Sequence, residues 1–202
     1  QTAKRIHDLV PQVRLLLLVR QPLERCWSHY LMVRMNAHSQ GITFEQFMTD
    51  ELYAQYLSYS DYGSQLQHYL RYFPRESIHI VESQSLDHHR DETLRKIFRF
   101  LNVDPEFRSA AFDRKLYEGR RRRFPSELGV RILKSRVMEW AASNLPFTAF
   151  EWLREVVLVP FSIPKPKREL SEAVEAAVIE RFRREVALAR QLSGLPLKSL
   201  EI

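Results

Sequence analysis

The feature that most constrains the fold is a short apolar block, Leu15–Val19, which lies between Pro11 and Pro22. So short an aliphatic run between two helix-breaking residues favours a strand over a helix. Because no polar position interrupts it, we expect this strand to be buried on both faces, as in parallel sheets covered by helices. A second block, Ile78–Val81, is rich in β-branched residues and predicts a second strand.

Helical patterns surround both predicted strands. Apolar residues recur at helical spacing over Leu23–Met35, Asp61–Phe73, Asp91–Leu101 and Ser171–Gly194, and most of 105–160 is helical in pattern. The order helix, strand, helix therefore occurs twice before a largely helical C-terminal part. This alternation predicts an α/β fold with a parallel sheet flanked by helices.

Composition limits the class of protein. The 202 residues suit a single domain, 1–202, and the single cysteine, Cys26, excludes an internal disulfide and a zinc site made of several cysteines. No apolar run approaches the roughly 20 residues of a membrane span. The compartment stays open, with the lone cysteine favouring the cytoplasm over the Golgi lumen.

The charge balance points to an anionic partner. There are 31 basic and 25 acidic residues, a formal surplus of +6. Nucleic acid, a nucleotide, an acidic sugar and a membrane surface all fit this surplus, as does a solvated surface with no functional meaning.

A possible phosphate clamp follows the first predicted strand. Ligands of open α/β sheets gather at the carboxyl ends of the strands, where Arg20 stands. Ser28 comes eight residues later, about two turns into the next helix, so it can face the same strand end. A guanidinium and a hydroxyl that converge can bind phosphate. The alternative is a surface arginine and a serine packed within the helix.

The same segment resembles a known family. Its pattern is a buried strand, then Arg, x, Pro, x, x, Arg, x, x, Ser, x, Tyr, starting at Arg20. It is similar to the 3′-phosphate-binding segment of sulfotransferases that use 3′-phosphoadenosine 5′-phosphosulfate (PAPS). The resemblance implies that Arg20 and Ser28 bind the 3′-phosphate. Family members usually have Asp or Asn where this chain has Gln21.

Later segments extend the resemblance to roughly residues 1–112 and 171–200. Ser60–Leu86, Leu94–Val103 and Leu192–Leu197 are similar to successive family segments, with Asn102 in place of the usual Gly. Asn also enters the left-handed region at helix ends, so this exchange is tolerable. The resemblance implies a three-layer, P-loop-like parallel sheet flanked by helices.

A second basic feature is the run Arg120–Arg123, which follows Gly119. Many sulfotransferases have a late loop of Gly and basic residues that closes on the 3′-phosphate, and the resemblance implies this role for Gly119, Arg120 and Arg121. A solvated charge run and a nucleic-acid contact are the alternatives.

Two expected parts of such an enzyme are not found in the sequence. Family members open with a strand and a loop of Lys, Gly and Thr that cradles the 5′-phosphosulfate, and no such segment precedes Gln1. We therefore expect the chain to be a fragment that lacks this segment and, with it, the catalytic base. His29 and His68 are the remaining candidates for the base, although a lone helical histidine is more often packed or exposed.

The resemblance implies transfer of a sulfuryl group from PAPS to a hydroxyl or amine acceptor, without a metal ion and with release of adenosine 3′,5′-bisphosphate. The acceptor stays open among carbohydrates, small molecules, carrier-bound acyl chains and peptides. One alternative is an inactive relative that only binds the nucleotide. The other is a basic nucleic-acid-binding module, which ranks last because aromatic and basic residues do not interleave as in single-strand binding platforms. We therefore expect no nucleic-acid partner and no membrane span.

Overall fold

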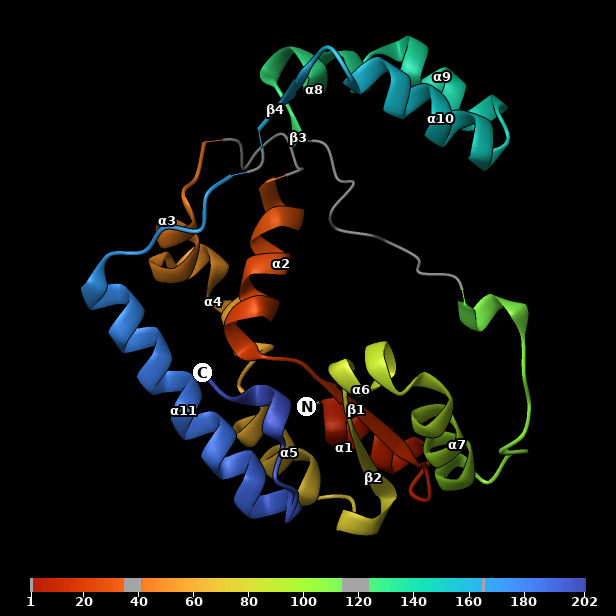
Figure 1. Ribbon diagram of the computed structural model, residues 1–202, viewed down its shortest axis with the longest axis vertical. Helices are drawn as coiled ribbons and strands as arrows, with labels where there is room; N and C mark the ends of the chain where they lie inside the picture. The colour runs from red at the N-terminus through yellow and green to blue at the C-terminus, as the bar shows by residue number, and fades with distance from the viewer. Residues whose placement is uncertain (1, 35–40, 114–123, 165) are drawn as a thin grey trace. The chain divides into compact units, whose positions relative to one another are not determined.

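The computed structural model describes residues 2–34, 41–113, 124–164 and 166–202 (Figure 1). These residues form two compact units. The first holds the described residues of Gln1–Cys26, Met48–Arg114 and Ser171–Ile202, and the second those of Trp27–Phe47 and Lys115–Leu170. Helix α2 (Pro22–Arg34) begins in the first unit and ends in the second.

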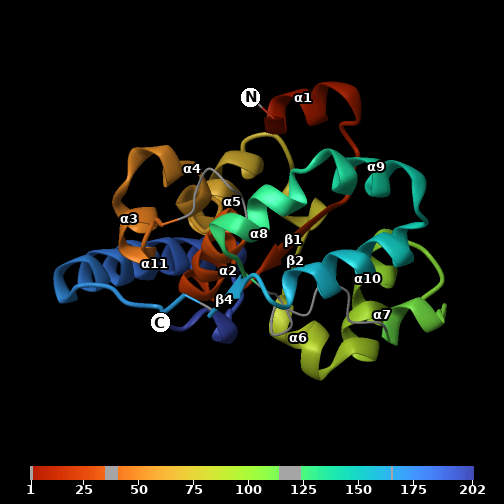
Figure 2. The ribbon, with the colours of Figure 1, turned by 90° about the horizontal axis from the view of Figure 1, so that it is seen from above.

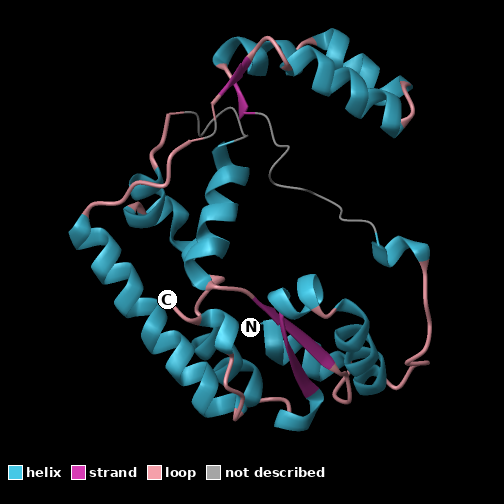
Figure 3. Cartoon of the chain, in the orientation of Figure 1, coloured by secondary structure: helices cyan, strands magenta, loops and turns pink. Residues whose placement is uncertain are grey.

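The first unit is built on two parallel strands. Helix α1 (Thr2–Leu9) precedes β1 (Leu15–Val19), which pairs with β2 (Ile78–Glu82) in a register that runs from Leu15 opposite Ile78 to Val19 opposite Glu82. The two strands lie side by side in Figure 3. Both predicted strands and their parallel pairing are confirmed, and the chain is an α/β protein with a small parallel sheet.

One face of β1 is open among the described residues. Leu15, Leu17 and Val19 face the core, whereas Leu16 and Leu18 are 45% and 50% exposed. The prediction that this strand is buried on both faces is wrong here. Helix α7 (Arg90–Leu101) contacts β2, and the described residues leave the second face of β1 about half exposed.

The other face of the sheet is covered by two helices. Helix α5 (Tyr62–Leu70) supplies Leu66 to the core, and the long helix α11 (Glu172–Ser193) supplies Val186. The two helices run beside each other in Figures 1 and 2. Gly194 caps the C-terminal end of α11, and its φ of 69° is a left-handed conformation that glycine adopts at little cost.

Shorter elements complete the first unit. Asn102 has a φ of 60° after α7, so the left-handed cap expected at this position is confirmed. The remaining elements are α4 (Ala54–Ser58), α6 (Ser83–His88) and the 3₁₀ turns Glu51–Tyr53, Arg75–Ser77, Ala110–Asp113 and Lys198–Leu200.

The second unit is mainly helical, as the sequence predicts for the C-terminal part. Helix α3 (Phe44–Thr49) begins in this unit, where Phe44 lies edge-on to Trp27. The other elements are α8 (Glu127–Leu133), α9 (Arg136–Asn144), α10 (Phe147–Leu158) and the antiparallel pair β3 (Phe124–Pro125) and β4 (Ser162–Ile163). Within the described part of the chain, no helix has the length and apolar character needed to cross a membrane.

Candidate anion site at the end of β1

Arg20 stands where the sheet ends. It follows Val19, the last residue of β1, and its side chain is 47% exposed. Its Nη2 atom lies 3.6 Å from Oε2 of Glu24, which is itself 42% exposed. An exposed ion pair at this distance contributes little free energy, so the Arg20 guanidinium can exchange this partner for a phosphate.

The turn from β1 into α2 is held by a local hydrogen bond. Pro22 is the first residue of α2, as expected for a residue without an N–H group. The side-chain Oε1 of Gln21 accepts the N–H of Glu24 at 2.6 Å, which satisfies a donor of the first helical turn. Gln21 thus caps the helix as a shorter Asp or Asn would. Its presence in place of Asp or Asn therefore leaves the start of α2 intact.

Tyr62 joins both sides of this turn. Its ring is 1% exposed, and its hydroxyl accepts the backbone N–H of Arg20 at 3.1 Å. The guanidinium of Arg25, on α2, lies over the same ring with its central carbon 5.8 Å from the centroid. The helical stripe of the sequence indicates that Tyr62 belongs to the core but gives no sign of its hydrogen bond to Arg20.

A buried polar contact supports the start of α2. Ser60 is fully buried, and its Oγ lies 3.5 Å from the carbonyl oxygen of Pro22 and 3.6 Å from Sγ of Cys26. Burial raises the pKa of the Cys26 thiol from 9.0 to about 11, although the contact with Ser60 opposes this shift. Cys26 is therefore a neutral thiol near neutral pH, with a structural rather than a nucleophilic role.

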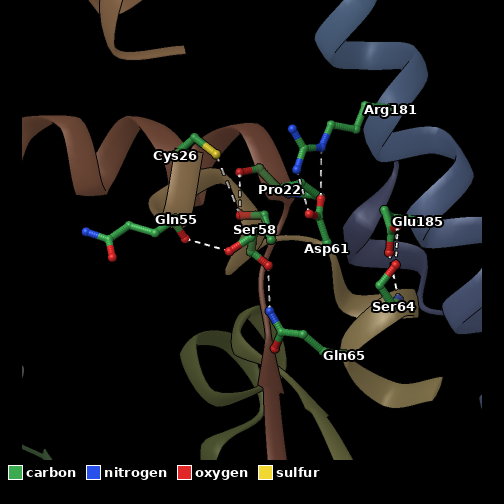
Figure 4. A network of polar contacts seen from close by, with 10 residues as sticks. Pro22, Cys26, Gln55, Ser58, Asp61, Ser64, Gln65, Arg181 and Glu185 are labelled. Carbon is green, nitrogen blue, oxygen red and sulfur yellow. Dashed lines mark hydrogen bonds and ion pairs between the residues drawn. The ribbon is translucent and has the colours of Figure 1, made fainter. Parts of the chain in front are cut away.

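Two polar contacts fix the beginning of α5 to α11 (Figure 4). The Arg181 guanidinium donates from Nε and Nη2 to the two carboxylate oxygens of Asp61, at 3.1 and 2.6 Å. The hydrogen bond to Asp61 raises the pKa of Arg181. The backbone N–H and the hydroxyl of Ser64 both donate to the carboxylate of Glu185, at 2.8 and 2.7 Å. Tyr62 thus lies between two residues that α11 holds in place.

Ser28 and the basic run after Gly119 are the other predicted phosphate contacts. Ser28 is partly buried on α2 and falls in the segment of that helix assigned to the second unit. That Ser28 and Arg20 bind the same anion stays a prediction. Gly119, Arg120 and Arg121 lie outside the described residues.

The two histidine candidates for the base are both helical. His29 is partly buried on α2. His68, on α5, lies edge-on to Tyr69 and Tyr72, with ring centroids 6.3 and 6.0 Å apart. His68 is therefore packed among aromatic rings. In the described ranges, no three His, Cys, Asp or Glu side chains gather as a metal site would require.

Comparison with known proteins decides the family. A sequence profile described as "Sulfotransferase domain" matches residues 6–117, which include Arg20, Ser28 and Tyr62. The chain belongs to the sulfotransferase family.

Two of the relatives are named for heparan sulfate. The chain is 29% identical over 114 residues to heparan sulfate glucosamine 3-O-sulfotransferase 5 of Mus musculus, which covers 52% of this chain and 33% of the relative. It is 25% identical over 113 residues to the bifunctional heparan sulfate N-deacetylase/N-sulfotransferase of Drosophila melanogaster, which covers 50% of this chain and 11% of the relative. The chain thus spans a third or less of the length of these curated relatives.

A solved structure agrees with the fold. The crystal structure of a sulfotransferase from Alicyclobacillus acidocaldarius matches 98% of this chain and 62% of its own, with a TM-score of 0.59 and 16% identity. At 16% identity the match is evidence for the fold alone.

Proposed function

We propose that this sulfotransferase-family chain transfers a sulfuryl group from PAPS to a carbohydrate acceptor. The observation that carries the proposal is the position of Arg20, at the carboxyl end of β1 and just before α2, within the segment that matches the family. Its side chain is half exposed, and the contact that the described residues offer it is a long ion pair with Glu24, so it fits an incoming phosphate.

The nucleotide would be held mainly by charge. Arg20 binds the 3′-phosphate, Ser28 of α2 adds a hydroxyl, and Gly119, Arg120 and Arg121 supply further phosphate contacts. The donor supplies an activated sulfuryl group, which the acceptor oxygen or nitrogen attacks in line. The bond from sulfur to the bridging oxygen breaks, adenosine 3′,5′-bisphosphate leaves, and the acceptor proton passes to a base. Such a reaction depends on positioning and on stabilised charge rather than on a metal ion.

The relatives support a proposal for the acceptor class and for the wider fold. Both relatives described above are named for heparan sulfate, which supports a sugar hydroxyl or amine as the acceptor. The similarity to the bacterial crystal structure supports a three-layer, P-loop-like sheet that includes β1 and β2.

The nucleotide part is tested by Arg20→Ala in the full-length protein. Loss of a charged hydrogen bond should weaken the binding of adenosine 3′,5′-bisphosphate by about 1.5–3 kcal/mol, roughly ten- to 150-fold. Isothermal titration calorimetry measures this change, and adenosine 5′-monophosphate serves as the ligand without the 3′-phosphate. Arg14→Ala is the matched control, because Arg14 is an exposed arginine just before the other end of the same strand, where its guanidinium contacts Phe100. Unchanged affinity in Arg20→Ala would refute the assignment.

The acceptor part is tested with labelled PAPS and three acceptors: desulfated heparan sulfate, a tyrosine peptide and a small alcohol. We expect label in the polysaccharide only. Label in the peptide or the alcohol alone would contradict a carbohydrate acceptor. Nucleotide binding without transfer to any of the three would instead favour the inactive relative.

A further inference from the structure

We propose that a pocket between α11 and the C-terminal segment 195–202 binds a small organic anion that carries a short apolar body. The pocket lies within the first unit and has a volume of about 410 Å³, in the range of small-molecule sites. It is lined by Arg183, Val186, Arg190, Leu200, Glu201 and Ile202. None of these residues belongs to the proposed nucleotide site, so this is a second site and does not depend on the first.

The walls of this pocket are held by hydrogen bonds. The C-terminal segment runs back beside α11 (Figures 1 and 2). Arg190 donates from Nε to the carbonyl oxygen of Pro196 at 2.7 Å and from Nη2 to that of Leu197 at 3.3 Å. The backbone N–H of Ser199 donates to Oε2 of Glu82, the last residue of β2, at 2.7 Å. Because the pocket is formed in advance, a ligand does not have to order it.

Two arginines give the pocket its preference for an anion. Arg183 and Arg190 are seven residues apart on α11, so they lie on one face of the helix, about two turns apart. Arg183 is exposed, and its guanidinium has no ion pair or hydrogen bond among the described residues. Guanidinium groups present paired N–H donors that match the oxygen atoms of an oxyanion. The pocket therefore offers positive charge that the protein itself leaves largely unused.

Glu201 occupies the place that a bound anion would take. Its Oε1 lies 3.6 Å from Nη2 of Arg190, and its side chain is 74% exposed. An exposed ion pair at this distance contributes little free energy, so the Glu201 carboxylate can turn out into water when another anion arrives. An anion that replaces it meets the guanidinium groups of both Arg183 and Arg190.

The remaining lining is apolar and selects the body of the ligand. Val186 is 4% exposed, Leu200 is fully buried and Ile202 is partly buried. An aliphatic chain placed against these side chains displaces water from an apolar surface, which an inorganic ion does not do. The ligand class is therefore an alkyl carboxylate or an alkyl sulfate, in which one anionic head group is joined to a short apolar body.

The probe is hexyl sulfate, titrated into the full-length protein and followed by amide chemical shifts in NMR spectra. We expect the largest shifts at residues 183–190 and 200–202, with a Kd of about 1 mM, as is usual for so small a ligand. Inorganic sulfate lacks the apolar body and hexan-1-ol lacks the charge, so each should bind at least about tenfold more weakly. Hexanoate replaces the sulfate by a carboxylate, and the tighter of the two anions identifies the head group.

Two arginine variants test the charge. Arg183→Gln removes one of the two guanidinium groups of the pocket and should weaken the binding of hexyl sulfate about tenfold. Arg184→Gln is the matched control, because Arg184 is the next residue of α11, is exposed, and pairs with Glu180 at 3.0 Å outside the pocket. Its affinity for hexyl sulfate should stay within about twofold of the wild type.

Glu201→Gln should change the affinity in the opposite direction. The neutral amide no longer competes for Arg190, so hexyl sulfate should bind about two- to fivefold more tightly, the scale of an exposed ion pair. A variant that had lost its structure could not produce this gain.

The second site is ruled out if hexyl sulfate at about 10 mM, ten times the expected Kd, shifts no amide of α11. It is also ruled out if hexan-1-ol binds as tightly as hexyl sulfate, if the two arginine variants lose affinity alike, or if Glu201→Gln gains none. Shifts around Arg20 that adenosine 3′,5′-bisphosphate abolishes would place the probe in the nucleotide site and overturn the second site as well.

Discussion

Cys26 shows how burial alone decides the chemistry of a residue. It lies in α2 with its side chain fully buried, and the only described polar contact of its sulfur is with the Ser60 hydroxyl. Ionisation would place a thiolate in an apolar surrounding, which is why the pKa rises to about 11. The native state therefore keeps its proton at a pH where the unfolded chain has lost it.

This shift predicts the direction of a pH effect on stability. Between about pH 9 and pH 11 the unfolded state binds fewer protons than the native state, so the free energy of unfolding should fall as the pH rises. Cys26→Ala removes the titrating group, and urea unfolding at a series of pH values should show a flatter decline for this variant. Parallel declines for the two proteins would show that other groups control the alkaline range.

Single residues also show what the sequence can reveal about the site. The position of Arg20 was predictable, because a short apolar block followed by Pro22 fixes both the strand end and the helix start. The hydrogen bond from Arg20 to Tyr62 was not, because periodicity indicates which face of α5 is buried but not which polar atom it meets. That information exists only once distant segments pack together.

At the scale of elements, the sequence predicted local structure better than it predicted how the elements pack. The strands, their parallel pairing, α2 and the caps at Asn102 and Gly194 all follow from spacing and residue type. The open face of β1 does not follow from the sequence. Four leucines and a valine in a row suit a strand that is covered on one face as well as a strand that is covered on both. Which helix covers which strand is decided by long-range contacts that a single apolar block does not encode.

The contact between α5 and α11 predicts the effect of Gly63→Ala. The added methyl would meet the Glu185 carbonyl oxygen at 2.5 Å and Cβ of Leu188 at 2.7 Å, so the two helices would have to separate. We expect a loss of about 1–3 kcal/mol in the free energy of unfolding, the usual cost of overpacking. Urea denaturation measures it.

The control is Gln67→Ala, an exposed position on the same helix. This change should leave stability within about 0.5 kcal/mol, as surface substitutions usually do. Equal stability of Gly63→Ala and the wild type would mean that the helices tolerate a wider separation than the structure shows.

At the scale of the whole molecule, the surplus of positive charge acts on every anionic ligand. The formal charge is +6, and Arg20 is half exposed, so salt should screen its attraction for a phosphate. The binding of adenosine 3′,5′-bisphosphate should weaken roughly three- to tenfold between about 0.05 and 0.5 M NaCl. Arg20→Ala should show a shallower dependence, because the charge that meets the 3′-phosphate is gone.

The same titration separates a nucleotide site from a general affinity for polyanions. A single-stranded oligonucleotide without a 3′-phosphate, added near physiological salt, should not compete with adenosine 3′,5′-bisphosphate, because a specific clamp requires the terminal phosphate as well as charge. Arg14→Ala is again the control, since it removes the same unit of charge away from the proposed clamp. If the oligonucleotide competes, and if Arg14→Ala and Arg20→Ala lose affinity alike, the basic surface as a whole binds the ligand and no site at the end of β1 is needed.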